Sequence, residues 1–190
     1  NITVSNGLIG AIDCNSGTMT GSLISGAAAS GVSFSIPYSG GNGGTHSGQT
    51  VQSTNVMGLT AVLAAGSFAN GAGSIVYSIT GTPPSTGTAH FAVNIGGKAC
   101  TFIANIGPGA IGSLNCGSGT PTGSLMAGTA ASGVSFAIPY TGGNGGTHSG
   151  QIISSTGVTG LTATLSSGIL NNGNGNFSYA VTGTPVGAGV

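Results

Sequence analysis

The sequence predicts an all-β protein built from two tandem immunoglobulin-like β-sandwich repeats, and three observations lead to this prediction. A long block is duplicated, because Ala28–Gln49 recurs as Ala130–Gln151 with two substitutions, at an offset of 102 residues. Apolar and polar residues alternate over short stretches, as in strands that bury one face. Glycine, with 40 of the 190 residues, separates these stretches, and no amphipathic helical stripe interrupts them.

The first repeat is placed at residues 9–107 and should contain eight strands. Their predicted ranges are Ile9–Cys14, Ser22–Ser25, Val32–Tyr38, Gln49–Thr54, Leu59–Ala65, Ser74–Thr80, Ala89–Ile95 and Ala99–Asn105. Alternation is clearest in the third, where every second side chain is apolar and would enter a core between two sheets. Seven or eight short strands in about 100 residues, with frequent turns, favour an immunoglobulin-like sandwich over a barrel or a propeller.

The second repeat is placed at residues 108–190 and follows the same pattern through Val134, Phe136 and Ile138. It is incomplete within this chain, because it has no counterparts of Ala89–Phe102. A sandwich without these strands would expose part of its core and an unpaired strand edge, which invites pairing with another chain. We therefore expect further protein to complete it.

Two explanations for the incomplete repeat remain open. The chain is either a window of a longer polypeptide with many such repeats, or a subunit whose gap is filled by a strand from a neighbour. Asn1 corresponds to Ile103, so residues 1–8 are either the tail of a preceding last strand or a donated strand. Ile2 and Val4 are then the expected assembly residues. Both explanations predict an extended assembly of copies.

Charge is almost absent, since Lys98 and Asp13 are the only charged side chains apart from histidine. The chain therefore lacks the basic surface that nucleic acids require and the basic cluster that binds anionic lipid. It also has no apolar run of about 18 residues, so no membrane insertion is expected. With so few titratable groups, stability should depend little on pH and salt.

The three cysteines predict a disulfide framework. Cys116 is the repeat counterpart of Cys14, and Cys100 lies at the start of the last strand of the first repeat. The first and last strands of an immunoglobulin-like sandwich commonly run side by side, which favours pairing Cys14 with Cys100 inside the repeat. Cys116 would then bond to a partner outside this chain segment. Pairing of Cys100 with Cys116 and buried free thiols are the alternatives.

Candidate chemical sites are weak. The glycine-rich segment Gly40–Gly48 contains His46 and recurs as Gly142–Gly150, but it lacks the lysine and the following helix of a phosphate loop. We interpret it as a loop between two strands. A catalytic triad needs a histidine oriented by an acid, and Asp13 is the only acidic residue, with Asn115 as its repeat counterpart. We therefore expect no enzyme, no metal site and no cofactor.

Five stretches of sequence resemble the tandem repeats of large secreted and cell-surface proteins of Bacteroidota. They are Ile95–Cys100, Thr120–Leu125, Ala130–Phe136, Pro139–Gln151 and Thr156–Leu165. Together with the spacing of the two copies, the resemblance covers essentially the whole chain. It implies an immunoglobulin-like extracellular stalk or filament module within a much longer polypeptide.

The sequence therefore predicts a structural segment or subunit of an extracellular filament or cell-surface stalk, whose partners are copies of itself. The alternative is an adhesin that recognises glycans or another surface. It would use a threonine-rich strand such as Gly160–Leu165. Tyr38 and Tyr140 lie at predicted strand ends where an aromatic ring could stack on a sugar, but such a tyrosine is more often a core-edge residue with its hydroxyl in water.

Overall fold

The computed structural model describes residues 6–189, and the chain divides after Pro108 into two units, each described here on its own. We call the part up to Pro108 unit 1 and the part from Gly109 unit 2. The repeat boundary predicted after residue 107 lies one residue before this division. Ile2 and Val4 lie outside the described residues, so their role in assembly stays a prediction.

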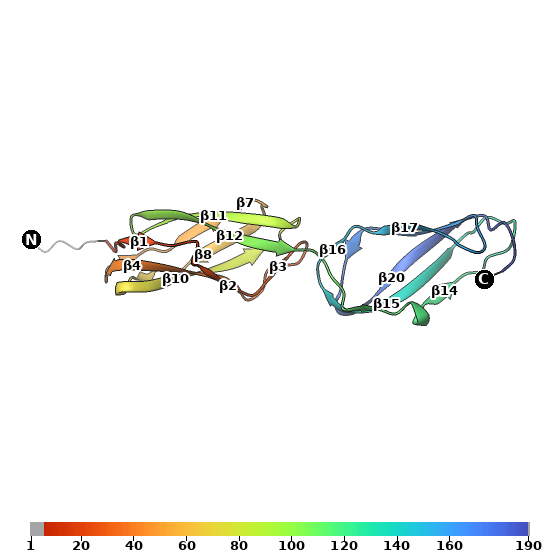
Figure 1. The fold of residues 1–190 in the computed structure, drawn as a ribbon, viewed down its shortest axis with the longest axis horizontal. Helices are drawn as coiled ribbons and strands as arrows, with labels where there is room; N and C mark the ends of the chain where they lie inside the picture. The colour runs from red at the N-terminus through yellow and green to blue at the C-terminus, as the bar shows by residue number, and fades with distance from the viewer. Residues whose placement is uncertain (1–5, 190) are drawn as a thin grey trace, which may run out of the picture. The chain divides into compact units, whose positions relative to one another are not determined.

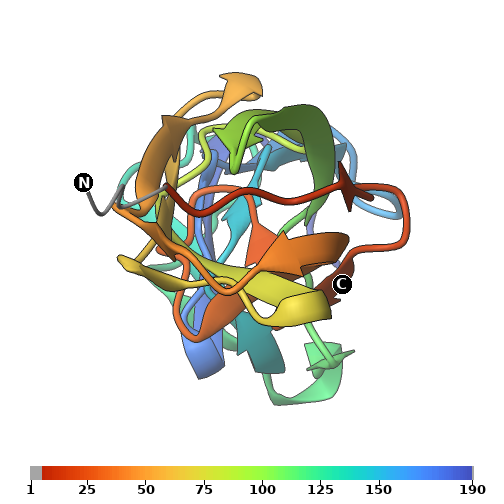
Figure 2. The same ribbon diagram turned by 90° about the vertical axis from the view of Figure 1, so that its left-hand side faces the viewer.

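Unit 1 is a sandwich of two sheets (Figure 1). The first has the order β1-β4-β10-β8-β6, with β2 also paired to β4, and the second has the order β3-β12-β11-β7. In the end-on view of Figure 2, green strands of the second sheet lie above the orange and yellow strands of the first. The strands of the first sheet are β1 (Ala11–Ile12), β2 (Thr18–Thr20), β4 (Val32–Asn42), β6 (Gln49–Gln52), β8 (Leu59–Leu63) and β10 (Asn70–Gly81). Those of the second are β3 (Leu23–Ile24), β7 (Thr54–Asn55), β11 (Gly87–Ile95) and β12 (Lys98–Gly107).

The core of unit 1 follows from alternation along the paired strands. Phe34 of β4 lies opposite Tyr77 of β10, and both side chains are buried. Phe102 of β12 meets them from the second sheet, with its ring centroid 4.3 Å from that of Phe34 in a stacked arrangement. The ring of Phe91 on β11 stacks on Phe102 at 4.8 Å. Offset aromatic stacking of this kind stabilises a core beyond its buried area.

Strands β11 and β12 form a hairpin, since Ile95 pairs with Lys98 and only two residues connect them. The connecting residues are Gly96 and Gly97, with φ of 59° and 77°. Two consecutive positive φ values are typical of the tight turn that matches strand twist, and glycine adopts them without strain. This hairpin supplies the central strands of the second sheet.

Each of the eight predicted strands of unit 1 has a counterpart, but four predicted ranges were too long, and two of them differ for a clear physical reason. The range Ile9–Cys14 contracts to β1, because Asp13 starts a hydrogen-bonded turn. The range Gln49–Thr54 splits at Ser53, where the chain leaves the first sheet as β6 and enters the second as β7. The buried Ser53 hydroxyl accepts a hydrogen bond from the Leu59 N–H at 3.1 Å, which fixes this corner.

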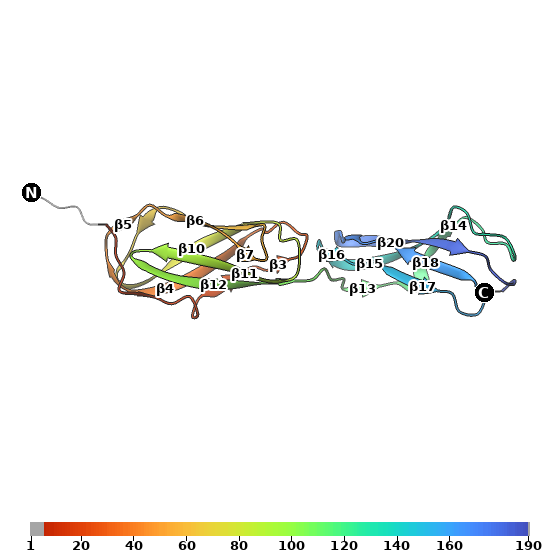
Figure 3. The ribbon, with the colours of Figure 1, turned by 90° about the horizontal axis from the view of Figure 1, so that it is seen from above.

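Unit 2 repeats the first sheet of unit 1 with the order β13-β15-β20-β18-β17, and with β14 paired to β15 (Figure 3). Phe136 lies opposite Tyr179, as Phe34 lies opposite Tyr77 in unit 1. The strands are β13 (Ser113–Leu114), β14 (Thr120–Thr122), β15 (Val134–Asn144), β17 (Gln151–Ser154), β18 (Leu161–Leu165) and β20 (Asn172–Gly183). A short 3-10 helix, η1, spans Cys116–Ser118, and a separate two-stranded pair joins β16 (Thr147–His148) to β19 (Gly168–Ile169).

Within residues 109–189, unit 2 has no counterpart of the second sheet of unit 1. No strand follows β20 up to residue 189, so β11 and β12 have no counterparts there. Leu125 and Met126 correspond to β3 but form no strand, and neither do Thr156 and Gly157, which correspond to β7. The physical reason is pairing, because β3 pairs with β12 and β7 with β11, and a two-residue strand does not persist without a partner.

The two units provide a matched test of this difference. Phe34→Ala should lower the free energy of unfolding of unit 1 by about 3 to 5 kcal/mol, because it empties a filled core position. Phe136→Ala should lower that of unit 2 by less than about 2 kcal/mol, because its side chain is already partly exposed to water. Urea unfolding followed by hydrogen exchange of each unit measures both. Equal losses would contradict the open core of unit 2.

Candidate assembly surface

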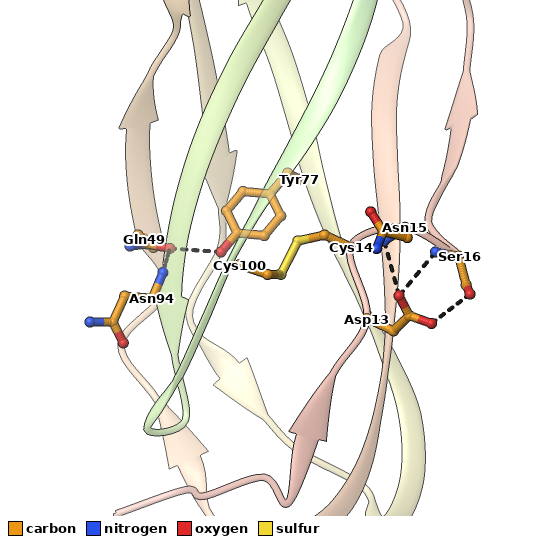
Figure 4. Close-up of a disulfide and its surroundings, with 8 residues drawn as sticks. All are labelled: Asp13, Cys14, Asn15, Ser16, Gln49, Tyr77, Asn94 and Cys100. Carbon is orange, nitrogen blue, oxygen red and sulfur yellow. Dashed lines mark hydrogen bonds between the residues drawn. A yellow bond between two sulfur atoms is a disulfide. The ribbon is translucent and has the colours of Figure 1, made fainter.

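The predicted disulfide between Cys14 and Cys100 is present in unit 1 (Figure 4). Cys14 follows β1 at the edge of the first sheet, Cys100 lies in β12 of the second, and their Cα atoms are 6.0 Å apart. The bond therefore links the two layers of the sandwich and closes a segment of 86 residues. A disulfide of this kind is typical of proteins from oxidising compartments.

Asp13, beside this disulfide, holds a turn through its carboxylate. Its carboxylate accepts hydrogen bonds from the Asn15 N–H at 3.0 Å, the Ser16 N–H at 3.2 Å and the Ser16 hydroxyl at 2.5 Å (Figure 4). The Ser16 side-chain and backbone hydrogen bonds lower the pKa of Asp13 below its usual value of 3.8. In unit 2, Asn115 forms the neutral version of this turn by donating to the Ser118 hydroxyl at 2.9 Å.

A second polar link in unit 1 joins the two sheets through Gln49. The Tyr77 hydroxyl donates to Gln49 Oε1 at 2.8 Å, and the Asn94 N–H of β11 donates to the same oxygen at 3.3 Å (Figure 4). Burial raises the pKa of Tyr77 to about 12. In unit 2 the Tyr179 hydroxyl donates to Gln151 at 2.8 Å, but residues 109–189 include no counterpart of β11. The tyrosine–glutamine hydrogen bond therefore recurs in unit 2 without the bond to a second sheet.

The main candidate surface is an apolar side of the unit 2 sheet, which we call the open face. It is formed by six side chains on β15, β18 and β20: Phe136, Ile138, Leu161, Ala163, Tyr179 and Val181. Their six counterparts in unit 1 are all buried, with exposed fractions of 6% or less. In unit 2 only Tyr179 is buried, at 6%, and the other five are partly exposed. The same positions are therefore covered in one unit and uncovered in the other.

The open face forms a hollow of about 320 Å³. Leu125 lies at its margin and is 43% exposed, whereas its counterpart Leu23 is 2% exposed. Ile153 of β17, on the other side, is 44% exposed. Contiguous apolar surface of this kind marks an interaction site, because water contact with it is unfavourable. The hollow offers few polar groups, and Ser154 and Ser155 are the polar residues that line it.

Cys116 is an exposed free thiol in η1, at the place that corresponds to Cys14. The alternative pairing of Cys100 with Cys116 is wrong, because Cys100 bonds Cys14. The predicted partner of Cys116 outside this chain segment stays a prediction.

The glycine-rich segments lie partly in strands. Gly40 to Asn42 belong to the end of β4, and β5 (Thr45–His46) pairs with β9 (Gly66–Ser67), so only part of the predicted loop is irregular. The buried Nδ1 atoms of His46 and His148 have no hydrogen-bond partner. Residues 6–189 contain no cluster of three or more histidine, cysteine or acidic side chains around either ring.

Tyr38 and Tyr140 are core residues, as the core-edge interpretation expects, but their hydroxyls bond the backbone and not water. Both rings are buried, at 6% and 4% exposure. Their hydroxyl oxygens accept hydrogen bonds from backbone N–H groups, Tyr38 from Ala69 at 2.6 Å and Tyr140 from Asn171 at 2.8 Å. The two tyrosines therefore anchor a neighbouring loop in each unit and are not available to a ligand.

Comparisons with known proteins found no match. No family model, no curated protein and no solved structure matches this chain. Among residues 6–189, no helix has the length and apolar character needed to cross a membrane.

The disulfide should contribute much of the stability of unit 1. Replacing both cysteines, Cys14→Ser with Cys100→Ser, should lower its free energy of unfolding by about 2 to 5 kcal/mol, because a long loop is then unconstrained in the unfolded state. The exposed Cys116→Ser is the matched control and should change stability by less than about 0.5 kcal/mol. Urea unfolding measures both. A large effect of the control would show that Cys116 has a structural partner.

The turn at Asp13 predicts that the stability of unit 1 changes with pH only in the acid range. Because the pKa of Asp13 is lower in the folded state, its stabilising contribution is fully present above pH 3.8, the usual pKa of the side chain. The contribution disappears as the pH falls through the lowered pKa of the folded state. Asp13→Asn should therefore be less stable than the wild type near neutral pH and equal to it in strong acid. Asn115→Asp, in the matching turn of unit 2, should gain the same dependence. Thermal unfolding across this range measures both, and a constant difference would contradict the assignment.

Proposed function

We propose that this chain is a structural segment of an extracellular filament or cell-surface stalk built from tandem immunoglobulin-like repeats. The observation that carries the proposal is the repetition of one strand register in both units, 102 residues apart, with Phe34 opposite Tyr77 and Phe136 opposite Tyr179. Repeating a whole domain lengthens a polypeptide without changing its surface chemistry. A spacer or fibre needs this property, whereas a single binding site does not.

Two further features support the proposal. The disulfide in unit 1 fits an oxidising, extracytoplasmic environment. The near absence of charge, with one basic residue and one acidic residue in 190, removes the long-range repulsion that keeps most proteins apart. Close contact between copies of the chain therefore meets little electrostatic resistance, so the partners that we propose are further copies of the repeat.

The alternative function is a glycan-binding adhesin. With Tyr38 and Tyr140 buried, its recognition surface would have to be the outward side of β18. Leu161 and Ala163 of this strand line the open face, so Thr162 and Thr164 point to the opposite side. A row of threonines can offer hydroxyls to a sugar.

Gold-labelled antibodies against the folded chain test the proposal on the cells that produce it. We expect labels at regular intervals along extracellular fibres or stalks. Labels confined to the cytoplasm would overturn the proposal. A glycan array probed with the purified chain is the parallel measurement: specific binding that is lost in Thr162→Ala with Thr164→Ala would favour the adhesin. The matched control is Thr60→Ala with Val62→Ala on β8, the corresponding strand of unit 1.

A further inference from the structure

Unit 1 shows what covers the surface that corresponds to the open face. Its six counterpart side chains pack against the hairpin of β11 and β12, whose inward side chains include Phe91, Val93, Phe102 and Ala104. Phe102 contacts three aromatic rings there, with centroid distances of 4.3 Å to Phe34, 4.8 Å to Phe91 and 5.8 Å to Tyr77. The cover is therefore a two-stranded layer with aromatic residues at its centre.

The segments on both sides of the open face correspond to segments that pair with the hairpin in unit 1. In unit 1, the backbone of β3 pairs in parallel with β12 through Leu23 and Ile106. On the other side, β7 pairs with β11 through Asn55 and Ala89. In unit 2 the segments that correspond to β3 and β7 form no strand, and Leu125 loses the burial of Leu23. An added hairpin would give both segments the backbone partners that they have in unit 1.

Cys116 is an independent observation that points to the same cover. Its counterpart Cys14 bonds Cys100, which lies on β12 two residues before Phe102. Cys116 is exposed, with a free thiol, beside a sheet whose apolar side is uncovered. A strand placed on the open face as β12 is placed in unit 1 would bring a cysteine at the Cys100 position to Cys116.

We infer that the open face of unit 2 binds a β-hairpin of the same type as the hairpin of β11 and β12. The hairpin has aromatic or β-branched residues at the positions of Phe91, Val93 and Phe102, and a cysteine at the position of Cys100. This inference rests on the proposed function, because it names the partner through which the repeats join. It also assigns Cys116 as the covalent attachment point.

The attachment is an oxidation of two thiols. The Cys116 thiol and the hairpin thiol lose two protons and two electrons, and a sulfur–sulfur bond forms between them. Glutathione disulfide accepts the two electrons and the two protons, its own sulfur–sulfur bond breaks, and two molecules of glutathione leave. The apolar contact places the two thiols together, which makes this bond faster than reaction with an unrelated thiol.

A hairpin fits the open face better than a second copy of that face. Two open faces packed together would bury the same six side chains, but they would leave the segments at Leu125 and Thr156 without backbone partners. They would also provide no cysteine in the position of Cys100 relative to Cys116. A glycan fits less well, because the hollow is lined almost entirely by apolar side chains.

The test uses the full chain and a synthetic peptide with the sequence of Gly87–Gly107, in a glutathione redox buffer. We expect the peptide to form a disulfide with Cys116, detected by mass spectrometry. We also expect slower hydrogen exchange at Leu125 and Met126. The control peptide keeps its cysteine but has serine in place of the residues at Phe91, Val93 and Phe102. Capture of the native peptide should exceed capture of the control at least tenfold.

Variants of the chain distinguish the contribution of the open face to peptide capture from that of the Cys116 thiol. Ala163→Glu places a charge in the open face and should reduce capture at least tenfold. Thr164→Glu, on the opposite side of the same strand, should leave capture unchanged. Cys116→Ser should abolish the disulfide but keep the hydrogen-exchange protection at Leu125, which shows that the face binds without the bond.

Three results would overturn the inference. The first is equal capture of both peptides. The second is a dimer in sedimentation that Ala163→Glu dissociates while the native peptide fails to bind, which makes a second copy the occupant. The third is protection of the face by a glycan instead of the peptide. The two proposals fail in different ways. If the native peptide is captured selectively but no labelled fibres are found on cells, this inference stands and the proposed function fails. If labelled fibres are found but the peptide is not captured, the proposed function stands and this inference fails.

Discussion

The structure of this chain depends on one constraint, which is that a sheet with an apolar side needs a second layer to cover it. Unit 1 meets the constraint with the hairpin of β11 and β12, and its core is accordingly dry and aromatic. Unit 2 has the same first sheet, in the same register, but residues 109–189 contain no second layer. The two units therefore present one covered copy and one uncovered copy of the same sheet.

Stability in this protein comes from packing, backbone hydrogen bonds and a covalent link, because ion pairs are almost unavailable. One disulfide joins the two layers of unit 1 at one end, and Gln49 joins them by hydrogen bonds through Tyr77 and Asn94. Ser53 fixes the corner where the chain passes from one layer to the other. The counterparts of the Tyr77 and Ser53 bonds recur in unit 2 at Tyr179 and Ser155, so the sheet itself is prepared for a second layer.

These features favour a protein whose function is spatial. A repeated domain provides length. In the proposed assembly, the apolar side that one unit covers and the other leaves uncovered would join repeats. The exposed thiol of Cys116 lies at the position where unit 1 has its covalent link. Apolar contact and thiol chemistry need no charged groups, which agrees with a sequence that contains almost none.

The sequence by itself determined the all-β class, the duplication and the pairing of Cys14 with Cys100, because alternation, spacing and cysteine position are local or countable features. It did not determine the sheet switch at Ser53 or the anchoring role of Tyr38, since both depend on partners far along the chain. The clearest case is the stretch Gly21 to Leu23, which recurs unchanged at Gly123 to Leu125. Its leucine begins a strand in unit 1 and none in unit 2. Tertiary structure decided this, because a short strand exists only where another strand supplies its hydrogen bonds.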